Sequence, residues 1–199
     1  MSVAVYRQWI QDVQRTIYLV LPTGPAATAG NVEEAEVTGL EIDAVFDFTS
    51  WLRVGATYAV TDAEYTDNRA FFARQTFFFD PYSDTPENAG SLYFMLKNQM
   101  AGVGGFSFRA EMYAQDSWYY ANTAASNAPG TEIDGYELIN IRAEWANIFD
   151  SKFNVAVFGR NLSEEEYFAG GNSNAATGGF NSVIPGEPRT YGAEFYYNF

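Results

Sequence analysis

The last twelve residues, 188–199, alternate between apolar and polar side chains right up to the C-terminus. At the side-chain period of a β-strand, one face of this segment carries Tyr191, Ala193, Phe195, Tyr197 and Phe199. Chain termini are usually frayed and polar. A strand whose apolar face meets lipid instead needs the pattern to its end, with aromatic residues at the membrane interface. The segment therefore favours the closing strand of a transmembrane β-barrel.

The same period of two recurs through most of the chain. It predicts an all-β fold, an antiparallel meander of about eight long strands. Residues 2–20 read as one long extended segment or two short ones, and the patterns after them are sharper. The predicted strands cover 2–20, 36–48, 52–61, 91–97, 106–115, 138–145, 153–160 and 188–199.

The predicted connections alternate between short turns and long loops. The short turns are 49–51, 98–102 and 147–151, and the long loops are 62–88, 116–134 and 163–187. A breaker-rich loop is also predicted at 22–30. Loops this long are uncommon in compact soluble domains, whereas outer-membrane barrels combine short periplasmic turns with long outer loops.

In the clearly alternating segments, charged side chains fall on the polar face and none falls on the apolar face, whereas Arg7 interrupts the apolar face of 2–20. Lys or Arg on the lipid face near the bilayer midplane costs roughly 2–4 kcal/mol, so this segregation fits a lipid-facing wall. Both signs of charge occur on neighbouring strands, which suggests a wet, charge-paired lumen. The candidate lumen charges are Arg109, Glu111, Arg142, Glu144 and Arg160. A soluble β-sandwich also alternates, so this pattern alone leaves both architectures open.

Composition removes several classes of function. The chain has no cysteine and no histidine, so it lacks disulfides, the usual general base and most zinc sites. A net charge of −14 argues against nucleic acid as a partner. No catalytic constellation, metal site or cofactor motif is present, which predicts a protein that is not an enzyme. No apolar run approaches the ~20 residues of a membrane-spanning helix, and the first residues do not form a secretory signal peptide.

Aromatic residues cluster in two of the predicted outer loops and are candidates for ligand contact. They are Phe71, Phe72, Phe77, Phe78 and Phe79 in one loop, and Trp118, Tyr119 and Tyr120 in the next. They could form a stacking platform for a siderophore, a carbohydrate or another aromatic ligand. Alternatively, they belong to the outer aromatic girdle or pack the loops together.

Two acidic runs invite a similar choice. Residues 33–36 and 164–166 hold the densest carboxylates. A solvated or strand-capping role is the simpler interpretation. Binding of divalent cations together with lipopolysaccharide is the alternative, since carboxylates are suitable oxygen ligands.

Three stretches resemble the C-terminal part of the β-barrel of TonB-dependent outer-membrane receptors. The first is the hairpin of 37–44 and 52–65, and the second is Tyr136 to Trp145. The third combines Gly159-Arg-Asn-Leu-Ser-Glu-Glu-Glu-Tyr167 with 185–192 and the terminal Phe199. Together they span residues 36–199.

The resemblance implies a barrel of about 22 strands plugged by an N-terminal domain. Residues 1–199 are then expected to be its last third, without plug, TonB-contacting segment or signal sequence. In intact form such a receptor imports a scarce solute, such as a ferric siderophore, across the cell outer membrane. The implied partners are outer-membrane lipid, lipopolysaccharide and the barrel assembly machinery, with TonB reached only through an N-terminal region. The expected assembly signal is Tyr191, Phe195, Tyr197 and Phe199.

Two alternatives stay open. The chain could be a self-contained eight-stranded outer-membrane barrel with a structural or adhesion role. It could also be a soluble β-sandwich that binds a ligand such as carbohydrate.

Overall fold

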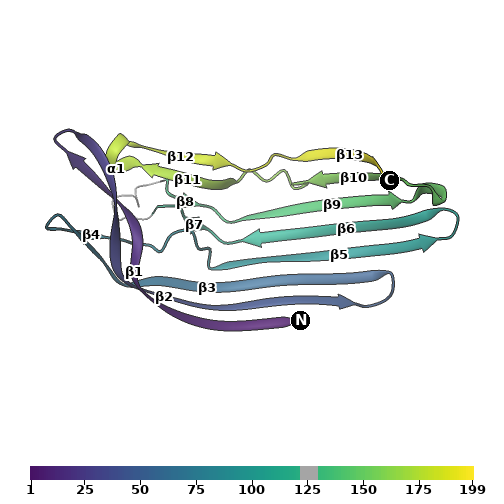
Figure 1. Ribbon diagram of the computed structural model, residues 1–199, viewed down its shortest axis with the longest axis horizontal. Helices are drawn as coiled ribbons and strands as arrows, with labels where there is room; N and C mark the ends of the chain where they lie inside the picture. Colours follow the sequence, from purple (N-terminus) through teal and green to yellow (C-terminus); the bar gives the residue numbers. More distant parts are fainter. Residues whose placement is uncertain (122–129) are drawn as a thin grey trace.

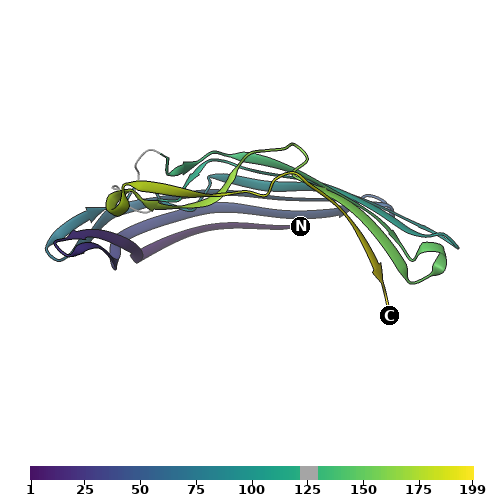
Figure 2. The same cartoon turned by 90° about the horizontal axis from the view of Figure 1, so that it is seen from above.

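The alternating segments form one antiparallel sheet in the computed structural model, which describes residues 1–121 and 130–199. Eight strands follow in the order β1-β2-β3-β5-β6-β9-β10-β13, and β4 pairs with the far end of β3. Figure 1 shows this meander, and Figure 2 shows the sheet bent into an arc. The predicted antiparallel meander of about eight long strands is confirmed.

Each strand of the sheet path pairs with its neighbours along the chain. The strands are β1 (Ser2–Leu21), β2 (Gly24–Asp47), β3 (Leu52–Phe72), β4 (Gln75–Phe78), β5 (Asn88–Met100), β6 (Gly104–Gln115), β9 (Tyr136–Ala146), β10 (Phe153–Arg160) and β13 (Thr190–Tyr197).

The sheet is open. Within residues 1–121 and 130–199, β1 pairs only with β2 and β13 only with β10, so these two strands are its edges. A closed eight-stranded barrel would pair β1 with β13. A β-sandwich would place a second large sheet against the first, whereas the two further sheets here have only two strands each.

The predicted short turns are present and lie together at one end of the sheet (Figure 1). The hydroxyl of Thr49 accepts hydrogen bonds from the backbone N–H groups of Trp51 and Leu52 at 3.2 and 3.0 Å. The turn between β9 and β10 holds a short 3-10 segment, Ile148–Asp150. The C-terminus lies at this same end.

The predicted loops at 22–30 and 62–88 are largely wrong. The structure replaces the first by a tight turn, because β2 begins at Gly24 and pairs with β1 from its first residue. Pro25 is tolerated there because β2 gains its second neighbour, β3, only from Val32 onward. In the second predicted loop, 62–88, β3 continues to Phe72, and the chain then turns back and forms β4 beside it. These extended segments carry no long apolar–polar alternation, so the sequence pattern did not reveal them.

The other two predicted long loops hold short hairpins. Within 116–134, β7 (Trp118–Tyr119) pairs with β8 (Glu132–Ile133), while residues 122–129 of that predicted loop lie outside the described residues. Within 163–187, β11 (Phe168–Asn174) pairs with β12 (Phe180–Pro185) across the four-residue helix α1 (Ala175–Gly178).

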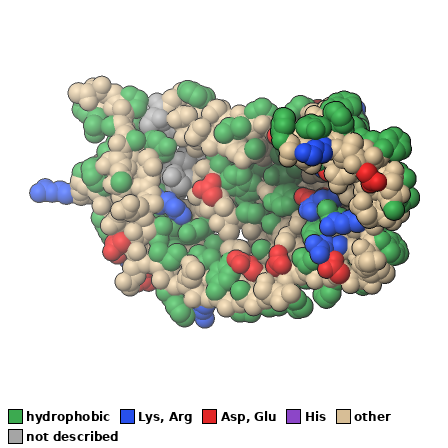
Figure 3. Space-filling view, turned by 45° about the vertical axis from the view of Figure 1, so that its right-hand side comes forward, with side chains coloured by type: hydrophobic (Ala, Val, Ile, Leu, Met, Phe, Trp, Pro, Cys, Tyr) green, Lys and Arg blue, Asp and Glu red, His purple; other side chains and the backbone are tan. Residues whose placement is uncertain are grey.

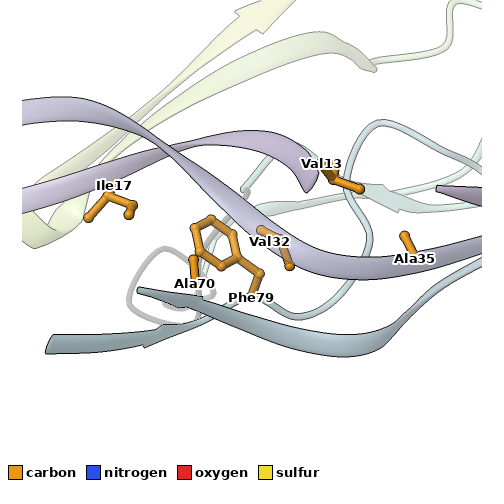
Figure 4. Close-up of a cluster of buried hydrophobic side chains, with 6 residues drawn as sticks. All are labelled: Val13, Ile17, Val32, Ala35, Ala70 and Phe79. Carbon is orange, nitrogen blue, oxygen red and sulfur yellow. The ribbon is translucent and has the colours of Figure 1, made fainter. Parts of the chain in front are cut away.

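Buried apolar side chains gather at the long-loop end of the molecule. β1, β2 and β3 have 20, 24 and 21 residues, about twice the ~9–11 that cross a membrane. Their far parts and the segment after β4 enclose one cluster, shown in Figure 4. Its members are Val13, Ile17, Val32, Ala35, Ala70 and Phe79. We call residues 10–35 and 62–87 the extension, and the remaining parts of the eight paired strands the wall.

In the wall, aromatic rings on the polar face lie over glycines of the next strand. Tyr93 is paired with Gly55, and Phe158 with Gly192. A Cβ placed on Gly55 would lie 2.2 Å from the Tyr93 ring, and one on Gly192 2.3 Å from the Phe158 ring. The missing side chain thus lets each ring lie flat against the sheet, as aromatic rescue of a strand glycine does.

Candidate functional site

The wall has one apolar face, which no other part of residues 1–121 and 130–199 covers. One row across it, fixed by the strand register, consists of Leu52, Leu96, Phe108, Ala143, Val157 and Ala193. Phe94 is 47% exposed and Phe195 79% exposed. Soluble monomers rarely leave a contiguous apolar surface of this extent open, so this face calls for an apolar surrounding.

Aromatic side chains line the short-turn end of the apolar face. Phe106 stacks on Trp145 with ring centroids 5.2 Å apart, and Phe149 meets Trp145 edge-on at 5.4 Å. At the C-terminus, Tyr197 lies 5.0 Å from Phe153 and 5.3 Å from Phe199. Aromatic girdles of this kind mark the membrane–water interface in transmembrane barrels.

The opposite face of the wall carries paired charges. The Arg109 Nε donates to Glu111 at 3.0 Å, and Arg142 donates to Glu194 at 2.7 Å. Arg142 also lies 3.5 Å from Glu144, whose carboxylate accepts a hydrogen bond from the Tyr196 hydroxyl. Figure 3 shows basic and acidic side chains together beside a hollow of the molecular surface. Four of the five predicted lumen charges, Arg109, Glu111, Arg142 and Glu144, thus share one side of β6 and β9.

The arginines of this face are also held by aromatic rings. The Arg109 guanidinium lies 3.9 Å from the centroid of the Tyr93 ring, and that of Arg160 lies 5.4 Å from the Phe158 ring. Arg109 and Arg142 are directly opposite in the register of β6 and β9, and together with Arg160 they line a pocket of about 220 Å³. Each ring rests on a glycine, so glycine, ring and guanidinium form a layered support. Such cation–π contacts contribute about 0.5–1 kcal/mol at exposed sites.

Arg160, in β10, completes the set of five predicted lumen charges. Arg160 has a weaker ion partner, Glu187, at 3.6 Å with both side chains exposed. The Glu144 carboxylate accepts hydrogen bonds from both Arg142 and the Tyr196 hydroxyl. All five predicted positions therefore lie on the polar side of the sheet or at its rim.

The predicted loop aromatics divide into structural and exposed residues. Phe79 is completely buried in the extension, and Tyr120 is buried and lies against Gly171 of β11. Phe71 and Phe78 are 58% and 52% exposed and lie on the opposite side of the β3–β4 hairpin from buried Ala70. Phe72 and Phe77 pack at the edge of the buried cluster, and Trp118 and Tyr119 are half-buried. The structure does not bring the eight residues together as one platform.

Arg15, which the sequence pattern does not single out, lies beside the buried cluster of the extension. The Arg15 Nε donates to the Tyr65 hydroxyl at 2.7 Å, and the Arg15 guanidinium lies 5.0 Å from the Tyr82 ring. Burial raises the pKa of Tyr65, and its hydroxyl oxygen accepts this bond. Only the pairing of β1 with β2 and of β2 with β3 brings these residues together, and no local motif signals it.

The family-like stretch after β10 is a structural corner. Asn161 is buried and donates to the carbonyl oxygens of Glu165 and Glu187 at 2.9 and 3.0 Å. Its side-chain amide oxygen, Oδ1, accepts a hydrogen bond from the backbone N–H of Glu165 at 2.8 Å. Tyr167 lies over Gly186 and 4.3 Å from the Tyr136 ring. Asn161 therefore ties the beginning of the long segment between β10 and β13, at Glu165, to its end, at Glu187.

The acidic runs have ion-pair roles where the structure shows their contacts. Glu36 pairs with Arg7 at 2.7 Å, and Glu164 with Arg189 at 2.8 Å. Across residues 1–121 and 130–199, no group of three or more carboxylates is arranged to hold a metal ion. In the same described ranges, no helix is long and apolar enough to cross a membrane.

Comparison with known proteins assigns the family. The family model of the TonB-dependent receptor-like β-barrel matches residues 1–162. The chain belongs to the TonB-dependent receptor β-barrel family. This family is one of receptors and not of enzymes. The match includes residues 1–35, which the sequence resemblance did not use, and it ends before the distinctive segment 185–199.

Solved TonB-dependent receptors share the fold. The siderophore receptor PiuA from Acinetobacter baumannii superposes with a TM-score of 0.67 at 20% identity, covering 98% of this chain and 26% of its own. The ferric yersiniabactin uptake receptor FyuA from Yersinia pestis gives 0.68 at 14% identity, with 99% and 34% covered. The ferric-catecholate import receptor Fiu from E. coli K12 gives 0.64 at 18%, with 98% and 25% covered. The chain thus spans about a quarter to a third of these receptors. A comparison with curated proteins found no match.

Proposed function

We propose that this chain is part of the barrel wall of an outer-membrane TonB-dependent receptor, and that the intact receptor takes up a scarce solute such as a ferric siderophore. The observation that supports this most is the division of the wall into an exposed apolar face and a charge-paired polar face. Lipid covers the first, and the second borders a wet lumen. The family membership and the siderophore receptors among the structural neighbours support the choice of solute.

Arg109, Arg142 and Arg160, with their glutamate partners, keep the lumen hydrated while leaving its charge nearly balanced. Because Arg160 has the weakest ion partner, it is the lumen cation best placed to contact a passing anion. At the outer end, the exposed Phe71 and Phe78 are the loop aromatics best placed to touch a ligand, while Phe79 and Tyr120 hold the loops in shape.

The C-terminal aromatics Tyr191, Phe195, Tyr197 and Phe199 serve as the recognition signal for the barrel assembly machinery. Phe199 is fully exposed and contacts Tyr197 at the end of the sheet. We expect Phe199→Ala to reduce the amount of assembled receptor in the outer membrane several-fold. Phe153→Ala, which removes another exposed ring of the aromatic girdle at the short-turn end, should have a much smaller effect. Equal losses for both variants would mean that Phe199 acts only as a member of this girdle and not as an assembly signal.

The uptake proposal is tested by expressing the complete native gene and fractionating the cells. We expect the protein in the outer membrane, and we expect its deletion to slow growth when a ferric siderophore is the sole iron source. Recovery in the soluble fraction would contradict the membrane location. A normal outer-membrane location without any iron phenotype would contradict the siderophore assignment only.

A further inference from the structure

A groove crosses the apolar face near the short turns. It runs over β5, β6, β9 and β10 and has a volume of about 620 Å³. This volume falls within the ~300–1,000 Å³ typical of ligand pockets. It lies on the opposite face from the arginine pocket, so it has no part in the proposed lumen.

The strand register explains the groove. Ala143 stands in the apolar row between Phe108 and Val157, and its small side chain leaves a depression between them. The stacked rings of Phe106 and Trp145 bound the depression toward the turns, and Trp51 flanks it from the β2–β3 turn.

The lining offers almost no hydrogen bonds to an occupant. Among side chains on this face, only Asn98 and the indole N–H of Trp51 can form a hydrogen bond with an occupant. Lys97, Ser107 and Glu144 also line the groove, but strand alternation directs their side chains to the polar face. The Trp145 indole N–H is already donated to the Val103 carbonyl oxygen at 2.9 Å. A peptide or a sugar would therefore lose its bonds to water without replacement, whereas a hydrocarbon chain would lose none.

The surroundings favour a lipid as the source of that chain. The groove continues into the exposed apolar face, and the aromatic residues of the short-turn end stand beside it. We propose that this groove holds one acyl chain of a phospholipid from the leaflet on the short-turn side, as a bound lipid that exchanges slowly. The inference rests on the proposed membrane insertion and adds a specific lipid partner to it.

The test measures retention of dioleoylphosphatidylglycerol by native mass spectrometry. The protein is expressed from its complete native gene and purified from membranes in a mild detergent. Ala143→Leu fills the groove from its floor and should weaken retention about ten-fold, the loss expected when about two methylenes are kept out of apolar contact. Ala110→Leu is the matched control, because Ala110 lies on the same face of β6 opposite Phe94 and Ile141. It should retain lipid as the unaltered protein does.

The outcomes separate this inference from the proposed function. Val157→Phe narrows the groove from its other side and supplies the same measurement if Ala143→Leu does not fold. Equal retention in all folded variants would overturn the groove as a lipid site while leaving membrane insertion intact. A peak for two protein copies that disappears in Ala143→Leu would overturn it in favour of self-association. Recovery of the unaltered protein outside the membrane fraction would overturn both.

Discussion

The wall and the extension are built from the same strands but are stabilised in opposite ways. In β3, the part from Leu52 to Val60 has two neighbouring strands and an apolar face that no other part of the described chain covers. Further along, the same strand places Ala70 in a cluster with Phe79, and both are completely buried. The extension therefore has a small core like that of a soluble domain. The wall has none, and its apolar side chains depend on the solvent around them.

This difference shows how one strand can serve two environments. In the proposed membrane insertion, lipid takes the place of a core around the wall, and backbone ladders and side-chain pairs across strands fix the register. Where the strands would leave the membrane, water surrounds them, and apolar groups must be enclosed by protein. The end of the apolar alternation at about Val60 marks this transition along β3.

The largest expected effect is at the core of the extension. Phe79→Ala removes a buried ring and leaves a cavity, at a cost of about 3–5 kcal/mol to the extension. We expect the amides of 62–87 to lose most of their protection in hydrogen exchange, while amides of β5 and β6 keep theirs.

Phe94→Ala is the matched change in the wall. Lipid moves into the space of the lost ring, so no cavity forms, and protection in 62–87 should not change. If Phe79→Ala instead unfolded wall and extension together, the two regions would be one cooperative unit and the comparison would fail.

A smaller effect is expected where ring and glycine meet in the wall. Gly192→Ala places a methyl group within the Phe158 ring, which must move and release its contact with Arg160. Overpacking of this kind costs about 1–3 kcal/mol. Urea titration in lipid vesicles measures it, with Gly170→Ala as the control, since a Cβ there meets its nearest atom at 3.7 Å. Combining Gly192→Ala with Phe158→Ala should recover most of the loss, and an additive double variant would argue against the layered support.

The smallest effect is expected from a single lumen ion pair. Glu194→Gln keeps the shape of the side chain and removes the charge that faces Arg142. Because both side chains are substantially exposed, the stability loss should be smaller than that of Gly192→Ala and should shrink further at high salt. The same titration at two salt concentrations checks this. A loss as large as that of Gly192→Ala would mean that the polar face is sealed from water.

The wall could be predicted from the sequence because its physics is local. Period two between Phe106 and Gln115, or between Phe153 and Arg160, indicates directly which side chains share the apolar face. The short turns follow from the same boundaries. The placement of Arg109 and Arg142 on one face was predicted for the same reason.

The extension could not be predicted in this way because its contacts are distant in sequence. The sequence predicts Pro25 to lie in a loop, because nothing local shows that this part of β2 pairs with β1 alone. Phe79 reads as one member of an exposed aromatic run, and only the return of β4 along β3 encloses it. The partners of Arg15 and the corner made by Asn161 likewise depend on strand pairing, so no motif within a few residues reveals them.

The wall has two chemically different faces, and the absence of cysteine from residues 1–199 permits a direct test of this difference. Single cysteines placed along β6, from Ser107 to Tyr113, are exposed in native membranes to a water-soluble maleimide that does not cross bilayers. The account predicts labelling at Ser107, Arg109, Glu111 and Tyr113 and protection at Phe108, Ala110 and Met112. Labelling that ignores this alternation, with both sets equally reactive, would contradict a wall between lipid and a wet lumen.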